Sequence, residues 1–233
     1  MKQLTLALMT TSLLMVGCGG GGSDTPNVTE IKNLNDAEKS YKSLSALSSL
    51  DKIGNKNNNL KMSKLSLEKT GTIPCDSGSI VYNISDDAKT TSFTMKKCSL
   101  DTSYFNGTMS MIKLDDNSEK FELKNMTIKD EKMTMISSSF IFIDNEAEHW
   151  ATMNGDMNIE SKCFTGKYNF KTIEKMYEAQ DQSDNVESGI IELNGATYTF
   201  ANPHVTIKVG SQERTILQSA LEKEIESSTT CSE

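Results

Sequence analysis

Apolar and polar residues alternate with a period of two along most of the chain after residue 78. This alternation is typical of β-strands that bury one face. Turn-prone clusters such as Ser85-Asp86-Asp87-Ala88 and Asn194-Gly195 separate the runs at hairpin spacing. Pro203 interrupts the last run, because a proline cannot donate a hydrogen bond to a β-ladder. The pattern predicts strands at 79–84, 90–95, 104–114, 120–129, 132–143, 147–159, 162–172, 189–193 and 196–209, with turns at 115–117, 130–131 and 144–146 among them.

Two segments have apolar residues at helical spacing instead. The first covers 36–53, with Asn35 or Asp36 as its N-cap and Gly54 as its C-terminal stop. The second covers 211–226. The apolar positions are Ala37, Tyr41, Leu44, Leu47 and Leu50 in the first segment and Ile216, Leu217, Ala220, Leu221 and Ile225 in the second.

These elements predict a mainly β fold, an antiparallel meander or curved sheet with one N-terminal and one C-terminal helix. Asn-Gly pairs at 106–107 and 154–155 recur at irregular intervals, which indicates bulges and turns that bend one sheet. Residues 36–233 are therefore expected to form a single β-rich domain.

The first residues have a different pattern. Lys2 gives a positively charged start, residues 4–15 are apolar but too few to span a bilayer, and Met15-Val16-Gly17 leads to Cys18. Residues 19–24 are rich in glycine, which is typical of a flexible tether. An ordinary secretory signal that happens to contain a cysteine is the alternative interpretation.

Residues 1–23 resemble the N-terminus of bacterial lipoproteins, in which signal peptidase II cleaves before a lipobox cysteine. The resemblance implies a signal peptide at 1–17, acyl chains on Cys18 and a tether at 18–35. Gly19 stands where an aspartate would favour retention in the inner membrane, so the resemblance implies the outer membrane of a bacterial cell envelope. No family resemblance extends beyond residue 23.

The cysteine count fits this compartment. The chain has five cysteines, and assigning Cys18 to lipid leaves Cys75, Cys98, Cys163 and Cys231 for two disulfides. A metal site is the alternative, although no two cysteines have CxxC spacing.

One hairpin favours a particular pairing. If Asp86-Asp87 is a two-residue turn, Ile80 faces Phe93, Tyr82 faces Thr91 and Cys75 faces Cys98, within reach of a disulfide. Cys163 then pairs with Cys231 by elimination.

Charge and motifs exclude several functions. The formal net charge of −8 disfavours binding to nucleic acid or to anionic lipid through electrostatics. The sequence has no GxSxG, HExxH or phosphate-binding glycine loop, and its two histidines, His149 and His204, have no spacing that pairs a base with a nucleophile. The carboxylate pairs at 86–87 and 115–116 lie in predicted turns, where aspartate is common for backbone reasons.

Two sets of residues have the spacing of metal ligands, and each has a simpler explanation. Asp181, Ser183, Asn185, Glu187 and Glu192 fit the spacing of a calcium loop, but Val186 stands where the loop needs glycine. A set of soft ligands for Cu(I) is better explained as side chains that fill an irregular core. That set comprises Met109, Met111, Met133, Met135, His149, Trp150, Met153 and Met157. Neither a metal nor a cofactor is expected.

The sequence therefore predicts a non-enzymatic binding or structural module, anchored to a membrane by lipid and able to contact an envelope protein or an apolar ligand. The alternative is a carrier or receptor for a lipid or other apolar ligand in a half-barrel-like cavity, as in lipoprotein-receptor half-barrels. Either Phe140 and Phe142 or Ile141 and Ile143 would then line an open cavity. A third hypothesis is a hydrolase that uses scattered carboxylates.

Overall fold

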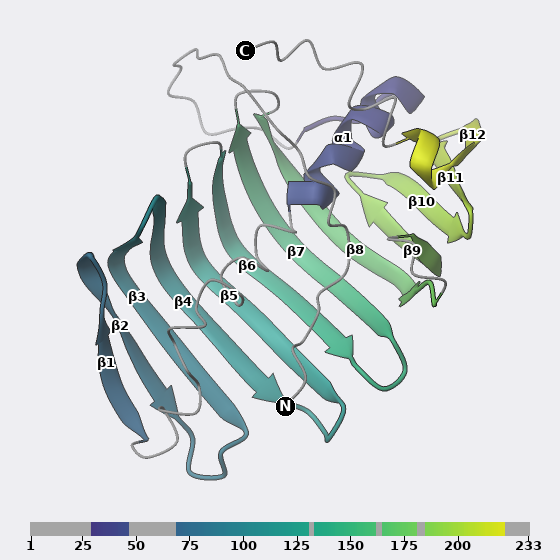
Figure 1. The fold of residues 1–233 in the computed structure, drawn as a ribbon. Coiled ribbons are helices and arrows are strands. Elements are labelled where there is room, and N and C mark those ends of the chain that lie inside the picture. The colour runs from purple at the N-terminus through teal and green to yellow at the C-terminus, as the bar shows by residue number, and fades with distance from the viewer. Residues whose placement is uncertain (1–28, 47–68, 131–132, 162–164, 181–184, 222–233) are drawn as a thin grey trace.

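One antiparallel sheet of twelve strands forms most of the structure, a computed structural model that describes residues 29–46, 69–130, 133–161, 165–180 and 185–221 (Figure 1). The strands follow one another in chain order, so the predicted antiparallel meander is confirmed. The strands are β1 (Thr70–Pro74), β2 (Ser77–Ile84), β3 (Thr90–Leu100), β4 (Ser103–Lys113), β5 (Ser118–Lys129), β6 (Met133–Asn145), β7 (Trp150–Ser161), β8 (Thr165–Glu178), β9 (Val186–Leu193), β10 (Ala196–Ala201), β11 (His204–Val209) and β12 (Gln212–Leu217).

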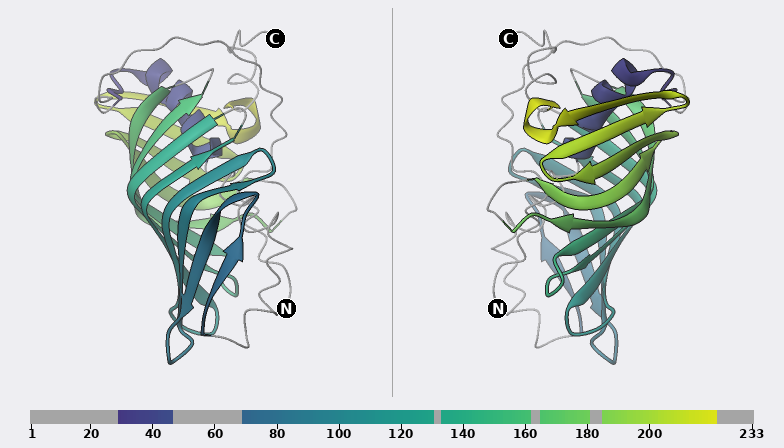
Figure 2. Two further views of the ribbon diagram at one scale, coloured as in Figure 1. Left: turned by 90° about the vertical axis from the view of Figure 1, so that its left-hand side faces the viewer. Right: turned by 90° about the vertical axis from the view of Figure 1, so that its right-hand side faces the viewer.

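The sheet is open, twisted and strongly curved (Figure 2). Its edges are β1 and β12. Alternate residues of each strand are buried, as β10 shows with Ala196, Tyr198 and Phe200 on one side. We call the side that carries these buried residues the inner face.

A continuous row of side chains crosses the inner face from β2 to β10. The central row consists of Tyr82, Phe93, Met109, Leu123, Phe140, Gly155, Phe170, Leu193 and Ala196, each opposite the next on the neighbouring strand. All of its apolar side chains except that of Met109 are buried. The row runs through the core of the molecule, which also includes buried residues of other rows such as Met135, Ile159 and Ile207, and burial of this core stabilises the fold.

Gly155 is the one member of the row without a side chain. Phe140 and Phe170 lie on either side of it and meet edge to face, with ring centroids 5.8 Å apart and planes at 88°. Gly155 has φ 137°, and a Cβ there would collide with Ser139 O and Phe140 Cα. A glycine is therefore required at this position both for backbone conformation and for space.

The N-terminal helix α1 (Leu34–Ala46) packs against β11 and β12. Its cap is Asn33, whose Oδ1 accepts a hydrogen bond from Asp36 N at 3.0 Å. The predicted cap at Asn35 or Asp36 was wrong, because Asp36 instead accepts from Lys32 N through its side chain. The predicted residues 47–53 of this helix and its stop at Gly54 lie outside the described residues.

The buried hydroxyl of Tyr198 fixes the helix on the sheet. It donates to Ala37 O at 2.7 Å, and the Tyr41 ring lies 5.8 Å from the Tyr198 ring. At the surface, Arg214 of β12 forms an ion pair with Glu38 at 2.6 Å. These contacts place α1 on the inner face at one end of the sheet.

The predicted helix at 211–226 was wrong in its first part. Residues 212–217 form β12, an edge strand that follows the turn at Gly210, and helix begins only at Gln218. Ile216 is partly buried whereas Leu217 is 43% exposed, as strand alternation requires and a shared helical face does not. Residues 222–226 lie outside the described residues.

The turn between β2 and β3 is longer than predicted. Ile80 pairs with Met95 and Tyr82 with Phe93, so the register predicted from a two-residue turn was wrong by two positions. Ser85 N donates to Thr90 O at 2.8 Å and closes a loop over residues 86–89. The Ser85 hydroxyl and the Asp87 carboxylate bond to each other and to loop amides, which stabilises the longer turn.

Candidate functional site

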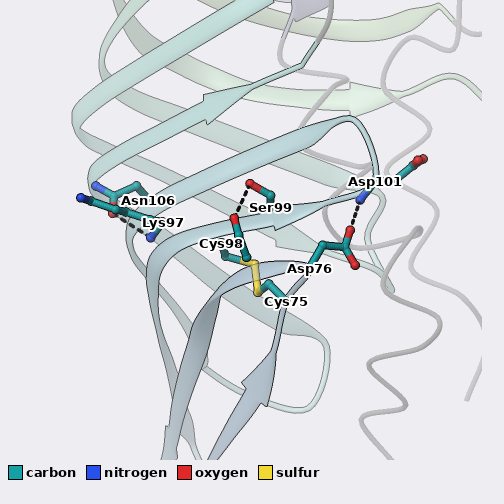
Figure 3. The surroundings of a disulfide bond; sticks show 8 residues. Cys75, Asp76, Lys97, Cys98, Ser99, Asp101 and Asn106 are labelled. Carbon is teal, nitrogen blue, oxygen red and sulfur yellow. Dashed lines mark hydrogen bonds between the residues drawn. A yellow bond between two sulfur atoms is a disulfide. The ribbon is translucent and has the colours of Figure 1, made fainter.

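A disulfide joins Cys75 to Cys98 and ties the turn between β1 and β2 to β3 (Figure 3). The two Cα atoms are 5.5 Å apart, and Cys98 is fully buried opposite Phe105. The structure thus forms the predicted bond despite the different register, because Cys75 lies in the turn between β1 and β2 and reaches Cys98 from outside the β2–β3 ladder.

Polar contacts surround this bond (Figure 3). Asp76 N donates to Ser99 O at 2.9 Å, and Asp76 Oδ2 accepts from Asp101 N at 2.8 Å. The bond closes a sequence separation of 23 residues. Loop entropy then gives a stabilisation of about 3 kcal/mol, so the disulfide is a structural clamp on the β1 edge.

The other predicted cysteine sites, Cys18, Cys163 and Cys231, lie outside the described residues. The acyl anchor and the second disulfide therefore stay predictions.

The register of β6 determines which of the predicted cavity residues face inward. Phe140 and Phe142 face inward, and Ile141 and Ile143 face outward. Phe140 is 1% exposed and packed against Phe170, so it fills the core. Phe142 is only partly buried.

Phe142 belongs to a second row on the inner face, nearer the turns that follow β2, β4 and β6. This apolar end row consists of Ile84, Thr91, Met111, Phe121, Phe142 and Met153. The Phe121 and Phe142 rings lie 6.2 Å apart, and every member except Met153 is only partly buried. The inner face is therefore filled at its centre and partly open toward this end.

A pair of carboxyl groups lies just beyond the apolar end row. Glu119 of β5 and Asp144 of β6 are directly opposite each other, and Lys113 is opposite Glu119 on β4. Burial, and then repulsion from Glu119 and Glu146, raises the pKa of Asp144 to about 6. Burial also raises the pKa of Glu119, against an opposing effect of Lys113.

Among the described residues, the Asp144 carboxyl lacks hydrogen bonds that would compensate for its burial. Its Oδ1 is buried and has no hydrogen-bond partner among the described residues. The negative charge of Glu119 makes the charged form of Asp144 less favourable still. Sequence reasoning missed the pair because it placed Asp144 in a turn at 144–146, whereas β6 continues to Asn145.

The residues considered for catalysis do not form a site. His149 lies in the turn before β7, with Nδ1 3.9 Å from Glu178 Oε2, whereas His204 begins β11 opposite Leu217. The carboxylates of Asp87 and Asp115 accept hydrogen bonds from residues of their own turns. Hydrogen bonds from Ser85 and from Lys89 N lower the pKa of Asp87, and one from Asn117 N lowers the pKa of Asp115.

The remaining turn carboxylates pair with lysines, Asp86 with Lys69 and Asp116 with Lys113. Such exposed ion pairs contribute little to stability, so they add no evidence for a chemical role.

The methionines considered for Cu(I) pack into the core. Met135, Met153 and Met157 are buried, and Met109, Met111 and Met133 pack against the same cluster. Trp150 has a different environment, since its Nε1 donates to Glu148 and Lys175 Nζ lies 3.6 Å from its ring centroid.

Of the calcium-loop candidates, Asp181 and Ser183 lie outside the described residues, and Glu187 and Glu192 are in β9. Within the ranges that the structure describes, no three His, Cys, Asp or Glu side chains come together where they could hold a metal ion.

The part of the chain that the structure describes contains no helix of the length and apolarity needed to cross a membrane. No protein-family model, curated protein or solved structure matches this chain.

Proposed function

We propose that this protein is a lipid-anchored protein of the bacterial cell envelope that acts as a non-enzymatic binding or structural module. The observation that carries the proposal is the filled centre of the inner face, where Phe140 and Phe170 meet across Gly155. A long curved sheet with a packed core is a rigid scaffold, and its twelve strands supply a large outer surface for contact with an envelope protein.

The non-enzymatic part of the proposal rests on the separation of the chemical groups. His149 and His204 belong to different hairpins, and the carboxylates of Asp87 and Asp115 are engaged by their own turns. Glu119 and Asp144 are the described carboxyl groups of raised pKa that lie opposite each other, and their neighbours in the register are Lys113 and Ala151, neither a hydroxyl nor a thiol.

A carrier or receptor for a lipid or other apolar ligand is the second candidate. The partly buried apolar end row favours it, because Phe121 and Phe142 offer apolar surface next to a polar rim. Burial of Phe140 and Phe170 weighs against a half-barrel-like cavity that runs through the sheet.

Native mass spectrometry distinguishes the two candidates. The soluble chain from Ser23 onward would be purified from cells without detergent, and the same sample would be extracted with organic solvent. We expect the mass of the chain alone and no released lipid for the module. A stoichiometric apolar adduct would reject the module and establish the carrier.

A further inference from the structure

Thr29 is fixed to one place on the sheet. Its N donates to Lys167 O at 3.0 Å, and its carbonyl accepts from Asn194 Nδ2 at 2.7 Å. Asn194 Nδ2 also donates to Lys167 O at 3.0 Å. Gly166 leaves space for this contact, because a Cβ there would collide with Thr29 Oγ1. The packed structure thus begins before the domain boundary predicted at residue 36.

The chain enters the sheet from a defined side. After Thr29 it continues to α1, where Ala37 accepts a hydrogen bond from the Tyr198 hydroxyl in the middle of β10. Thr29 itself lies beside the start of β8 and the turn between β9 and β10. Thr29 is the first residue that the structure describes, so the described chain begins at this place on the sheet. We call it the exit region and define it by Thr29, Thr165, Gly166, Lys167 and Asn194.

Trp150 lies far from the exit region. It pairs with Tyr177 on β8, ten residues along the strand from Lys167. At about 3.3 Å per residue, this separation is about 33 Å. The turns beside Trp150 define the far end of the domain, residues 114–117 and 146–149.

The distance between the lipid and Thr29 is limited by chain length. Eleven peptide units separate Cys18 from Thr29. They span at most about 38 Å, and a glycine-rich chain of this length has an r.m.s. span of about 18 Å. If the far end rested on the bilayer, Thr29 would stand up to about 33 Å above it along the curved strand, which exceeds the r.m.s. span of the chain between Cys18 and Thr29 and makes this arrangement unfavourable.

Charge favours the same arrangement. The far end carries four carboxylates, those of Asp115, Asp116, Glu146 and Glu148, and two lysines lie beside it. Lys113 pairs with Asp116, and Lys175 lies over the Trp150 ring. Residues 165–168 and 194–195 of the exit region contain a single charged side chain, Lys167. Glu160 lies opposite Thr165, so the exit region is close to neutral and the far end has the larger excess of negative charge. An anionic lipid surface therefore repels the far end more strongly than the exit region.

We propose that the exit region faces a phospholipid bilayer and that the acidic far end points away from it. This inference rests on the proposed anchor at Cys18. It assigns the far end and the outer face of the sheet as the surfaces open to an envelope partner.

The sole tryptophan of the chain provides the test. The full acylated protein would be placed in phosphatidylethanolamine and phosphatidylglycerol vesicles that contain a dansyl lipid, and energy transfer from tryptophan would be measured. A Trp150→Phe/Thr165→Trp variant moves the donor to the exposed start of β8, and Trp150→Phe alone gives the background. Trp150→Phe/Ser211→Trp gives a second reporter, in the exposed turn between β11 and β12.

We expect the energy transfer from a tryptophan at position 165 to be at least three times that from Trp150. The transfer from position 211 should resemble the transfer from position 165 more than that from Trp150. Equal transfer from positions 165 and 150, or greater transfer from Trp150, would overturn the orientation. Vesicle flotation in high salt distinguishes a wrong orientation from the absence of the lipid anchor. A protein that does not float with the vesicles has no anchor, and then both the proposed anchor and this inference are rejected.

Discussion

Phe140 and Phe170 lie on β6 and β8 and contact each other edge to face across Gly155 of the strand between them. The contact continues the apolar row over a position that has no side chain. It therefore joins the two halves of the sheet into one core.

Gly155→Ala tests this relationship. The new Cβ would meet backbone atoms of Ser139 and Phe140 at a φ of 137°, so the free energy of unfolding should fall by about 3 kcal/mol. Gly195→Ala is the control, since Gly195 also has positive φ but nothing within 4 Å of its added Cβ. Its cost should be about 1 kcal/mol. Urea unfolding measures both, and equal losses would show that space at Gly155 is unimportant.

Asp144 predicts a pH dependence of stability. Its pKa in the folded protein is about 6, above the ordinary value of 3.8, so the folded state takes up a proton first as pH falls. Stability should therefore rise as pH falls from about 7 to about 4. After allowance for solvent screening, the gain is about 1 to 2 kcal/mol.

Asp144→Asn should remove this gain and stabilise the protein at pH 7.5 by a similar amount. Glu174→Gln removes one negative charge from an exposed position on β8 and is the matched control. Urea unfolding at several pH values gives the comparison. A stability that rises with pH from 4 to 7 in the wild type, and not in Asp144→Asn, would contradict the account.

The disulfides can be mapped directly. Digestion without reduction should give a peptide that links Cys75 to Cys98. A second peptide should link Cys163 to Cys231, because these two cysteines remain when Cys18 is acylated and Cys75 is bonded to Cys98. A Cys75 to Cys163 peptide would overturn both pairings.

Gln218 joins the end of β12 to the start of β9. Its buried amide accepts from Val186 N at 3.0 Å and donates to Val186 O at 2.9 Å. Gln218→Met keeps the volume but leaves both backbone groups unpaired, and it should lower the free energy of unfolding by about 2 to 3 kcal/mol. Gln212→Met, on the exposed start of β12, should change it by less than about 0.5 kcal/mol. Equal effects would show that the Val186 contact is not important.

The sequence predicts most of the sheet because burial on one face imposes a period of two, which is visible directly in β10 and β11. It misses β1, whose five residues include a glycine and a proline. It also misassigns β12, because an exposed edge strand with Glu213 and Arg214 lacks the alternation that burial produces.

Local side-chain contacts account for the other differences. The hydrogen bond between Ser85 and Asp87 stabilises the longer turn. Asn33 is the N-cap of α1 because its side chain accepts a hydrogen bond from Asp36 N. The carboxyl pair depends on register, since Glu119 and Asp144 are 25 positions apart in the chain and meet only across the β5–β6 hairpin. No short motif marks such a pair.

The most direct test of the proposed anchored module is the mass of its mature N-terminal peptide, isolated from the envelope fraction of cells that express the full chain. The account predicts a peptide that begins at Cys18 and carries a thioether-linked diacylglyceryl group and an amide-linked acyl chain, and predicts that Cys18→Ser loses both. A peptide that begins elsewhere, or an unmodified Cys18, would contradict the lipid anchor.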